Sequence, residues 1–201
     1  MARDRIGTPR EVSAFVRQLE GRIEDLVKGS NRVALAYSGG LASTLVAMVA
    51  RKRCDLDCLV AGSSESADVR AARAAKQHMD YRIELVLLDG AATRQIRDRL
   101  VAARPGLSPR AVRSLLPLFA VVERAEGIPW LAGFGGTRVD SRIITESQRL
   151  GVRAPLLDLS NGGSIPRAML RAAAVLLGLP EKWARVPHRA PPNGAGIAAF
   201  L

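Results

Sequence analysis

VALAYSGGLAS, at residues 33–43, sets an apolar run directly before two glycines that are flanked by serines. The run from Val33 to Tyr37 is typical of a strand buried on both faces, because such strands carry continuous apolar residues. From Ala42 onward the apolar residues suit a helix. A strand that turns through glycines into a helix can hold a phosphate, since the backbone comes close, successive N–H groups form an anion nest and the helix dipole adds positive charge. The stretch therefore predicts a phosphate-binding loop at the end of a strand.

Helical and strand-like segments alternate around this loop. A capping box at Thr8 and Glu11, with Pro9 at the first helical position, predicts an amphipathic helix that runs to Gly29. Strand, helix, strand order is typical of a parallel sheet with right-handed crossovers. We therefore predict an α/β fold, a three-layer Rossmann-like parallel sheet with helices on both faces. The expected strands cover 33–37, 58–61, 83–88 and 130–132, and the expected helices about 42–53, 67–79, 92–103 and 109–126.

Single residues mark the ends of these helices. Ser66 and Ser108 are expected N-caps, and Gly127 is an expected stop, because serine hydroxyls accept from the first N–H groups and glycine adopts the left-handed conformation. Pro117 falls inside the helix expected at 109–126, and it predicts a kink there, because proline removes one helical hydrogen bond.

Length and composition bound the class of protein. The chain has 201 residues, of which 48% are hydrophobic, and this suits one domain around one core. No apolar run reaches the roughly 18 residues of a membrane span, and the N-terminus lacks the apolar core of a secretion signal, so we expect a soluble, cytoplasmic protein without membrane contact. Cys54 and Cys58 have no second cysteine pair beside them, and we expect free, buried thiols rather than a zinc site.

The charge is strongly basic, at +11 with 30 Lys and Arg against 19 Asp and Glu. Such a balance suits polyanion binding, because basic side chains near phosphates release counterions. The arginines are nevertheless scattered through every expected helix, and aromatic residues make up only 4% of the chain. No motif of a nucleic-acid-binding module is present, so nucleic acid is not an expected partner.

Three loops at the expected strand ends are unusual, and ligands of parallel sheets bind there. They are the serine and glycine loop at 38–43, a serine-rich loop at 62–68, and the loop at 133–138, which has three glycines in its first four residues. One such loop can be an ordinary tight turn, but three at successive strand ends indicate a nucleotide site. The expected nucleotide-binding residues are Leu35, Ala36, Ser38, Gly39, Gly40, Leu41, Ser43, Ala61, Gly62, Gly133 and Gly135.

Five short motifs follow one another along the chain. They are SGGLAS at 38–43, the set Gly62, Ser66 and Asp68 before an alanine-rich helix, Gly133 with Gly135, VRAPLLD at 152–158, and a closing series with MLR, LPE, RVPHRAP and GAG between 169 and 196. In this order they resemble the ATP pyrophosphatase (PP-loop) superfamily, adenine nucleotide alpha hydrolase-like, and within it the synthetase domain of asparagine synthetase and asparagine synthase-related proteins.

The resemblance implies a HUP-type fold that binds ATP. In the family a carboxylate attacks the α-phosphorus, pyrophosphate leaves with the help of magnesium, and ammonia or an amine then displaces AMP. The implied partner is a small-molecule substrate with a carboxylate or an amine, and a homodimer is left open. The implied organisation is an N-terminal helix over 1–30 in the same domain, a nucleotide-binding domain over 31–184, and a tail over 185–201 that folds over the phosphate side. No glutaminase domain fits within 1–30, so nitrogen is expected from free ammonia, a partner or an amine.

The chain departs from the family at the metal-binding positions. Ala42 and Thr137 stand where the family has aspartates that bind magnesium, and Arg138 replaces the glutamate that follows. Magnesium needs oxygen ligands, so we expect no protein-bound metal, and magnesium only as carried by the nucleotide. The lysine of the closing motif corresponds to His188, beside Arg189. The candidate catalytic groups are therefore Arg138, His188 and Arg189, which could supply positive charge to the phosphates; the alternative for each arginine is an ordinary solvated side chain.

Two functions stay open on this sequence. The first is an ATP-dependent, AMP-forming carbon–nitrogen ligase or amidotransferase of the asparagine synthase type, without a glutaminase domain and with a weakened magnesium site. The second is a catalytically degenerate nucleotide-binding or regulatory protein. Phe134 stands where synthetases often carry an acid, which indicates a substrate other than aspartate. If a metal is bound after all, Asp140 and Asp158 are the alternative ligands.

Overall fold

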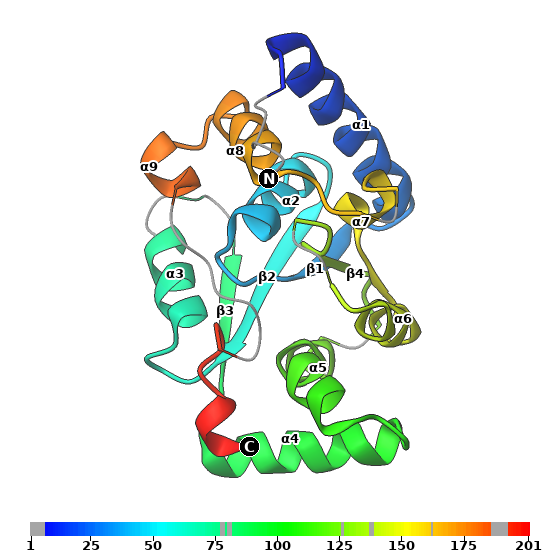
Figure 1. The fold of residues 1–201 in the computed structure, drawn as a ribbon, viewed down its shortest axis with the longest axis vertical. Helices are drawn as coiled ribbons and strands as arrows, with labels where there is room; N and C mark the ends of the chain where they lie inside the picture. Colours follow the sequence, from blue (N-terminus) through cyan, green and yellow to red (C-terminus); the bar gives the residue numbers. More distant parts are fainter. Residues whose placement is uncertain are drawn as a thin grey trace.

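The central feature of the fold is a five-stranded, all-parallel sheet in the order β3-β2-β1-β4-β5 (Figure 1). It is known from a computed structural model, which describes residues 7–76, 79, 82–125, 127–136, 139–161, 163–185 and 193–201. The parallel pairing confirms the predicted α/β class. The strands are β1 (Arg32–Ala36), β2 (Asp55–Gly62), β3 (Arg82–Leu87), β4 (Trp130–Ala132) and β5 (Val152–Arg153).

The strands β1, β2 and β4 are buried on both faces over most of their length, which explains their apolar residues, whereas the edge strand β3 is only partly buried. In β1, Val33 and Leu35 belong to one buried cluster, whereas Ala34, which points the other way, belongs to a second. Successive side chains of a strand alternate between faces, so each strand must be apolar on every residue to bury both. The sheet therefore separates two hydrophobic cores.

Helices cover the two faces as separate layers. Figure 1 shows α1, α2 and α8 on one side of the sheet and α4 and α5 on the other. The first layer holds α1 (Pro9–Val27), α2 (Leu41–Ala50), α3 (Ala67–Lys76), α7 (Pro155–Leu159), α8 (Arg167–Leu176) and α9 (Glu181–Ala184). The second holds α4 (Gly90–Ala103), α5 (Pro109–Val122) and α6 (Ser141–Arg149), and the described chain ends in the short helix η1 (Ala198–Phe200), which contacts α4.

The helix caps agree with the sequence. The hydroxyl of Thr8 accepts from the N–H of Glu11, and the carboxylate of Glu11 accepts from the N–H of Thr8. The hydroxyls of Ser66 and Ser108 accept from N–H groups three residues on, at the starts of α3 and α5. These bonds satisfy N–H groups that have no partner within the helix.

Several predicted boundaries are wrong. β2 begins at Asp55 rather than at residue 58, because its polar first residues face an ion-pair cluster: Arg32 and Arg82 both pair with Asp57. α2 ends at Ala50, earlier than expected. The expected last turn of α3 includes residues 77 and 78, which lie outside the described residues.

The end of α5 also differs. It ends at Val122, so Gly127, although its φ is 79°, lies beyond the helix and is not its stop. The indole N–H of Trp130 donates to the carbonyl of Ala125, and this bond holds the connection outside the helix. Pro117 lies inside α5, and the kink stays a prediction.

The patterns in the sequence predict neither β5 nor α6 to α9. β5 has two residues, α9 four and α7 five, which is too short for a periodic signal. Cys58 is a buried free thiol as expected, whereas Cys54 is only partly buried, because it lies in the turn before β2.

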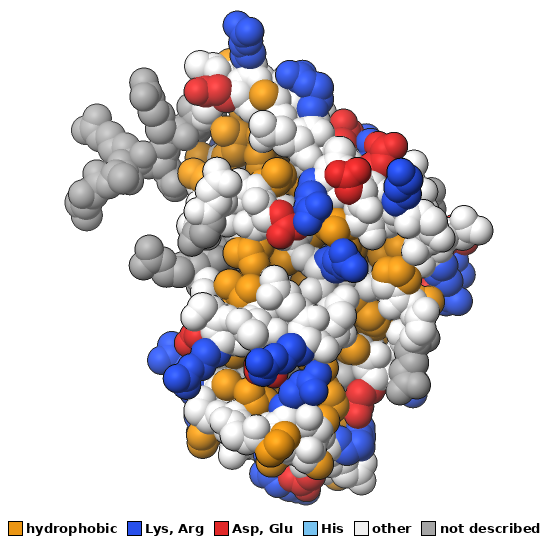
Figure 2. All heavy atoms as spheres, turned by 90° about the vertical axis from the view of Figure 1, so that its right-hand side faces the viewer, with side chains coloured by type: hydrophobic (Ala, Val, Ile, Leu, Met, Phe, Trp, Pro, Cys, Tyr) orange, Lys and Arg blue, Asp and Glu red, His pale blue; other side chains and the backbone are white. Residues whose placement is uncertain are grey.

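The surface is mixed in charge. On the face drawn in Figure 2, Lys and Arg form several separate groups with acidic and hydrophobic side chains between them. None of the helices in the described part of the chain combines the length and the apolar character that a membrane crossing requires.

Candidate functional site

The loop after β1 is held together by its own hydroxyls. The side-chain oxygens of Ser38 and Ser43 lie 3.2 Å apart, and the Ser43 hydroxyl donates to the carbonyl of Gly40 at 3.0 Å. The Ser38 hydroxyl in turn accepts from the N–H of Gly40 at 3.4 Å. Since both serines bond within the loop, the loop is shaped before any ligand arrives.

The helix that follows this loop has an open amino terminus. α2 begins at Leu41 with Gly40 as its N-cap, and no side chain caps it. Its first N–H groups and the positive end of its dipole are therefore directed at the end of the sheet where the carboxyl ends of the parallel strands lie, called the carboxyl edge below. This arrangement suits a phosphate, which accepts several N–H bonds at once.

Gly39 is required for a reason that the sequence does not show. Its φ is 69°, and a Cβ placed there would overlap the Cβ of Ala71 in α3. Gly39 thus lets the loop after β1 pack against α3 rather than leaving space for a ligand. The feature of the sequence that could have indicated this contact is the alanine-rich helix after β2, since small residues permit such close packing.

The loop after β4 packs directly on the loop after β1. A Cβ at Gly133 would lie 2.6 Å from the backbone nitrogen of Ser43, and one at Gly136 would lie 2.7 Å from the Cβ of Ala42. Real Cβ atoms do not approach other atoms so closely, so only glycine fits at either position. Because β1 and β4 are neighbours in the sheet, two motifs about ninety residues apart in sequence meet at one edge.

The loop after β2 meets the end of the chain. The N–H of Ser63 donates to the carbonyl of Ala195 at 2.9 Å, and the N–H of Asp68 donates to the carbonyl of Gly194 at 3.0 Å. Ala195 and Ile197 are fully buried. Residues 193–201 therefore form one wall of the carboxyl edge, beside the serine-rich loop.

Asp68 is a buried carboxyl group at this wall. It lies in the first turn of α3 with 4% of its surface exposed. Burial raises its pKa to about 7, because the low-dielectric surroundings disfavour the charged form. Near neutral pH the group is therefore partly protonated.

The metal position of the family offers no oxygen in the described residues. The side chain of Ala42 has no oxygen, and its methyl group packs beside Gly136, which in turn lies close to Leu170. Asp140 and Asp158, the alternative ligands, are engaged elsewhere. Asp140 caps α6 by accepting from the N–H of Arg142, and Asp158 pairs with Arg22 at 2.7 Å.

A wider search for ligands gives the same picture. Across the described ranges, no three His, Cys, Asp or Glu side chains lie together as a metal site. The α2 side of the site therefore offers no carboxylate to a magnesium ion.

The structure brings most of the predicted nucleotide residues to one edge. Leu35 and Ala36 close β1, Ala61 and Gly62 close β2, and the loop residues Ser38, Gly39, Gly40, Leu41, Ser43, Gly133 and Gly135 follow β1 and β4. Thr137, Arg138, His188 and Arg189 lie outside the described residues. Phe134 is partly buried against the core of the α4, α5 and α6 layer.

One pair of interacting side chains beside the loop was not predicted from the sequence. The hydroxyls of Tyr37 and Thr44 lie 3.1 Å apart and are buried, tying the end of β1 to α2. Both also line a small cavity of about 50 Å³ that reaches α3 and Trp183. The feature of the sequence that could have indicated this pair is the hydroxyl of Tyr37 at the end of the apolar run 33–37.

Comparison with protein families gives one match. The family model described as Asparagine synthase matches residues 15–130, which is more than half of the chain. The match runs from within α1 to the first residue of β4, and it includes the loops after β1 and β2. The comparison with curated proteins gave no match.

Proposed function

The chain belongs to the asparagine synthase family, and from this premise we propose that it binds ATP at the loop after β1 and uses it in AMP-forming carbon–nitrogen ligation. The observation that carries the proposal is the open amino terminus of α2, set at the edge where the loops after β1, β2 and β4 converge. A helix start of this kind stabilises phosphate by its N–H groups and dipole.

Under this proposal, different residues contact the phosphates and the adenosine. The hydroxyls of Ser38 and Ser43 and the N–H groups of α2 suit the phosphates, while the strand ends at Ala36 and Ala61 suit the adenosine. Leu35 is fully buried in the core and is not available to the nucleotide. Under this proposal a substrate carboxylate oxygen bonds to the α-phosphorus as the bond to pyrophosphate breaks. Ammonia or an amine then attacks the acyl carbon, AMP leaves, and the nitrogen loses a proton to solvent.

Charge compensation is the weak part of this proposed enzyme. Magnesium would arrive with the nucleotide, since Ala42 contributes no ligand. Arg138, His188 and Arg189 are the proposed sources of further positive charge toward the phosphates. Loss of metal anchoring raises the barrier to pyrophosphate release, because the charge of the leaving group is then less neutralised.

The second candidate is a nucleotide-binding or regulatory protein without turnover. One observation favours it. The methyl group of Ala42 stands where the family has a carboxylate, and Gly136 packs against this methyl group. The two candidates share the ATP site and differ only in the formation of AMP and pyrophosphate.

ATP binding is tested at Ser43. We expect Ser43→Ala to weaken ATP binding at least about tenfold, because it removes the hydroxyl whose bonds to Ser38 and Gly40 shape the loop. Titration calorimetry measures the affinity. Ser147→Ala is the matched control, since Ser147 is also a buried helical serine but bonds only to its own helix, in α6. Equal affinities of the two variants, or no binding by the wild type, would refute the site.

Magnesium dependence tests the weakened metal site. We expect wild-type ATP affinity to change by less than about threefold between magnesium and chelator, since the protein adds no metal ligand. Ala42→Asp with Thr137→Asp should gain a clear magnesium dependence, whereas the control pair Ala42→Asn with Thr137→Asn should not. Strong magnesium dependence in the wild type would contradict this. Release of AMP and pyrophosphate with a carboxylate and ammonia separates the ligase from the binding protein.

A further inference from the structure

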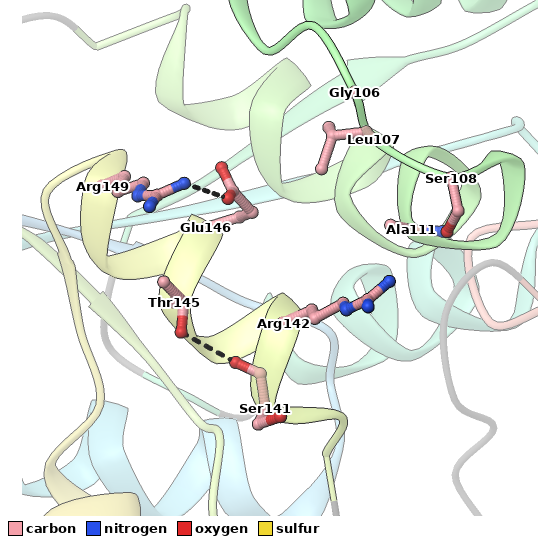
Figure 3. Close-up of a pocket in the computed structure, with 9 residues that line it drawn as sticks. All are labelled: Gly106, Leu107, Ser108, Ala111, Ser141, Arg142, Thr145, Glu146 and Arg149. Carbon is pink, nitrogen blue, oxygen red and sulfur yellow. Dashed lines mark hydrogen bonds and ion pairs between the residues drawn. The ribbon is translucent and has the colours of Figure 1, made fainter.

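A cleft of about 430 Å³ lies away from the nucleotide loops, between the α4–α5 connection and α6 (Figure 3). Its walls include Ser108 and Ala111 at the start of α5, and Arg142, Thr145, Glu146 and Arg149 on α6. None of its lining residues belongs to 38–43, 62–68 or 133–136. The volume is within the range of small-molecule sites, which run from about 300 to 1,000 Å³.

The cleft has an excess of positive charge. Glu146 is shared by two arginines: its carboxylate lies 2.6 Å from Arg149 and 3.5 Å from Arg104. One negative charge between two guanidinium groups leaves one positive charge uncompensated. The negative charge of Glu146 is therefore offset by these two arginines, and its repulsion of an anion in the rest of the cleft is reduced.

Arg142 adds a further positive charge. Figure 3 shows its side chain extending across the cleft from α6 toward Ser108 and Ala111. No ion pair joins its guanidinium to a carboxylate of the described residues, and Asp140 accepts only from its backbone N–H. A guanidinium in this position can bind an oxyanion through two parallel N–H bonds.

The start of α5 faces the same space. The Ser108 oxygen accepts from the N–H of Ala111, which leaves its hydroxyl hydrogen able to donate. α5 has 14 residues, and the positive end of its dipole lies at the cleft. Leu107 and Ala111 supply apolar wall beside these donors, which suits a carbon skeleton.

We propose that this cleft binds a small organic oxyanion, with its charged group between Arg142 and the start of α5. The site is separate from the proposed ATP site, because it lies in the other helical layer and shares no residue with the phosphate loop. Carboxylates and phosphates are both oxygen-bearing anions that this site could bind. The experiment below distinguishes between them.

The experiment measures binding of succinate and of phenyl phosphate to the full chain by calorimetry, without nucleotide and at low salt. We expect one of the two to bind, and Arg142→Gln to weaken that binding at least about tenfold. Arg113→Gln is the matched control, because it removes the same charge from an exposed position of α5 outside the cleft, and it should leave affinity nearly unchanged. The probe that binds identifies the class of anion.

Three results would overturn the proposal: binding of neither probe, equal weakening by both variants, or binding that survives in Arg142→Gln. Equal weakening would mean that net charge alone attracts the anion. Ser43→Ala should leave the anion affinity intact, so the outcome here is independent of the outcome for ATP. The far-ultraviolet circular dichroism of each variant shows whether it is folded.

Discussion

Gly133→Ala is expected to lower the free energy of unfolding by about 3 kcal/mol, because the new methyl group has no room. Its Cβ would lie 2.6 Å from the backbone nitrogen of Ser43 and 2.8 Å from its Cα. These are backbone atoms in the first turn of α2, so they cannot rotate away as the end of a flexible side chain can. Relief requires β4 or α2 to move.

Gly21→Ala is the control for this substitution. Gly21 lies inside α1, and no atom lies within 4 Å of a Cβ placed there. Alanine should stabilise the protein at this position by up to about 1 kcal/mol, because it has the higher helix propensity. Urea denaturation of both variants measures the two changes. A Gly133→Ala protein as stable as the wild type would show that the loops after β1 and β4 are not in contact.

The protein is expected to lose stability as the pH rises from about 4 to about 7, through the buried carboxyl group of Asp68. Its pKa is about 7 in the folded chain against 3.8 as the ordinary value. In this range the folded state binds more protons than the unfolded state, so the free energy of unfolding falls with rising pH. The loss is on the order of 4 kcal/mol, nearly complete above pH 7.

Asp68→Asn tests this directly, because the amide has the same shape and does not titrate. Its free energy of unfolding should lack the decline between pH 4 and 7 that Asp68 contributes, and above pH 7 the variant should be more stable than the wild type. Asp98→Asn serves as the control, since it removes an exposed carboxylate of α4 and should leave the decline that Asp68 contributes in place. Wild-type and Asp68→Asn curves of the same slope would mean that Asp68 is charged in the folded protein.

Both expectations depend on contacts that no local pattern reveals. The capping box at Thr8 and the apolar run at 33–37 are local signals, and they predicted the start of α1 and the strand β1. The burial of Asp68 is different, because residues 193–201 cover the loop after β2. Nothing within a few residues of Asp68 distinguishes it from a solvated carboxylate at a helix start.

The sequence by itself determined the α/β class, the parallel sheet and the place of the glycine loop between β1 and α2, because periodicity, caps and glycines act over a few residues. Only the tertiary structure decided what each glycine is for. Gly39 packs against Ala71, and Gly133 against Ser43, across separations that local patterns do not span. The cleft at Arg142 likewise exists only because the α4–α5 connection and α6, which are separated by β4 in the chain, fold side by side. Local chemistry sets which elements form, and the packing of distant elements sets which of their side chains can meet a ligand.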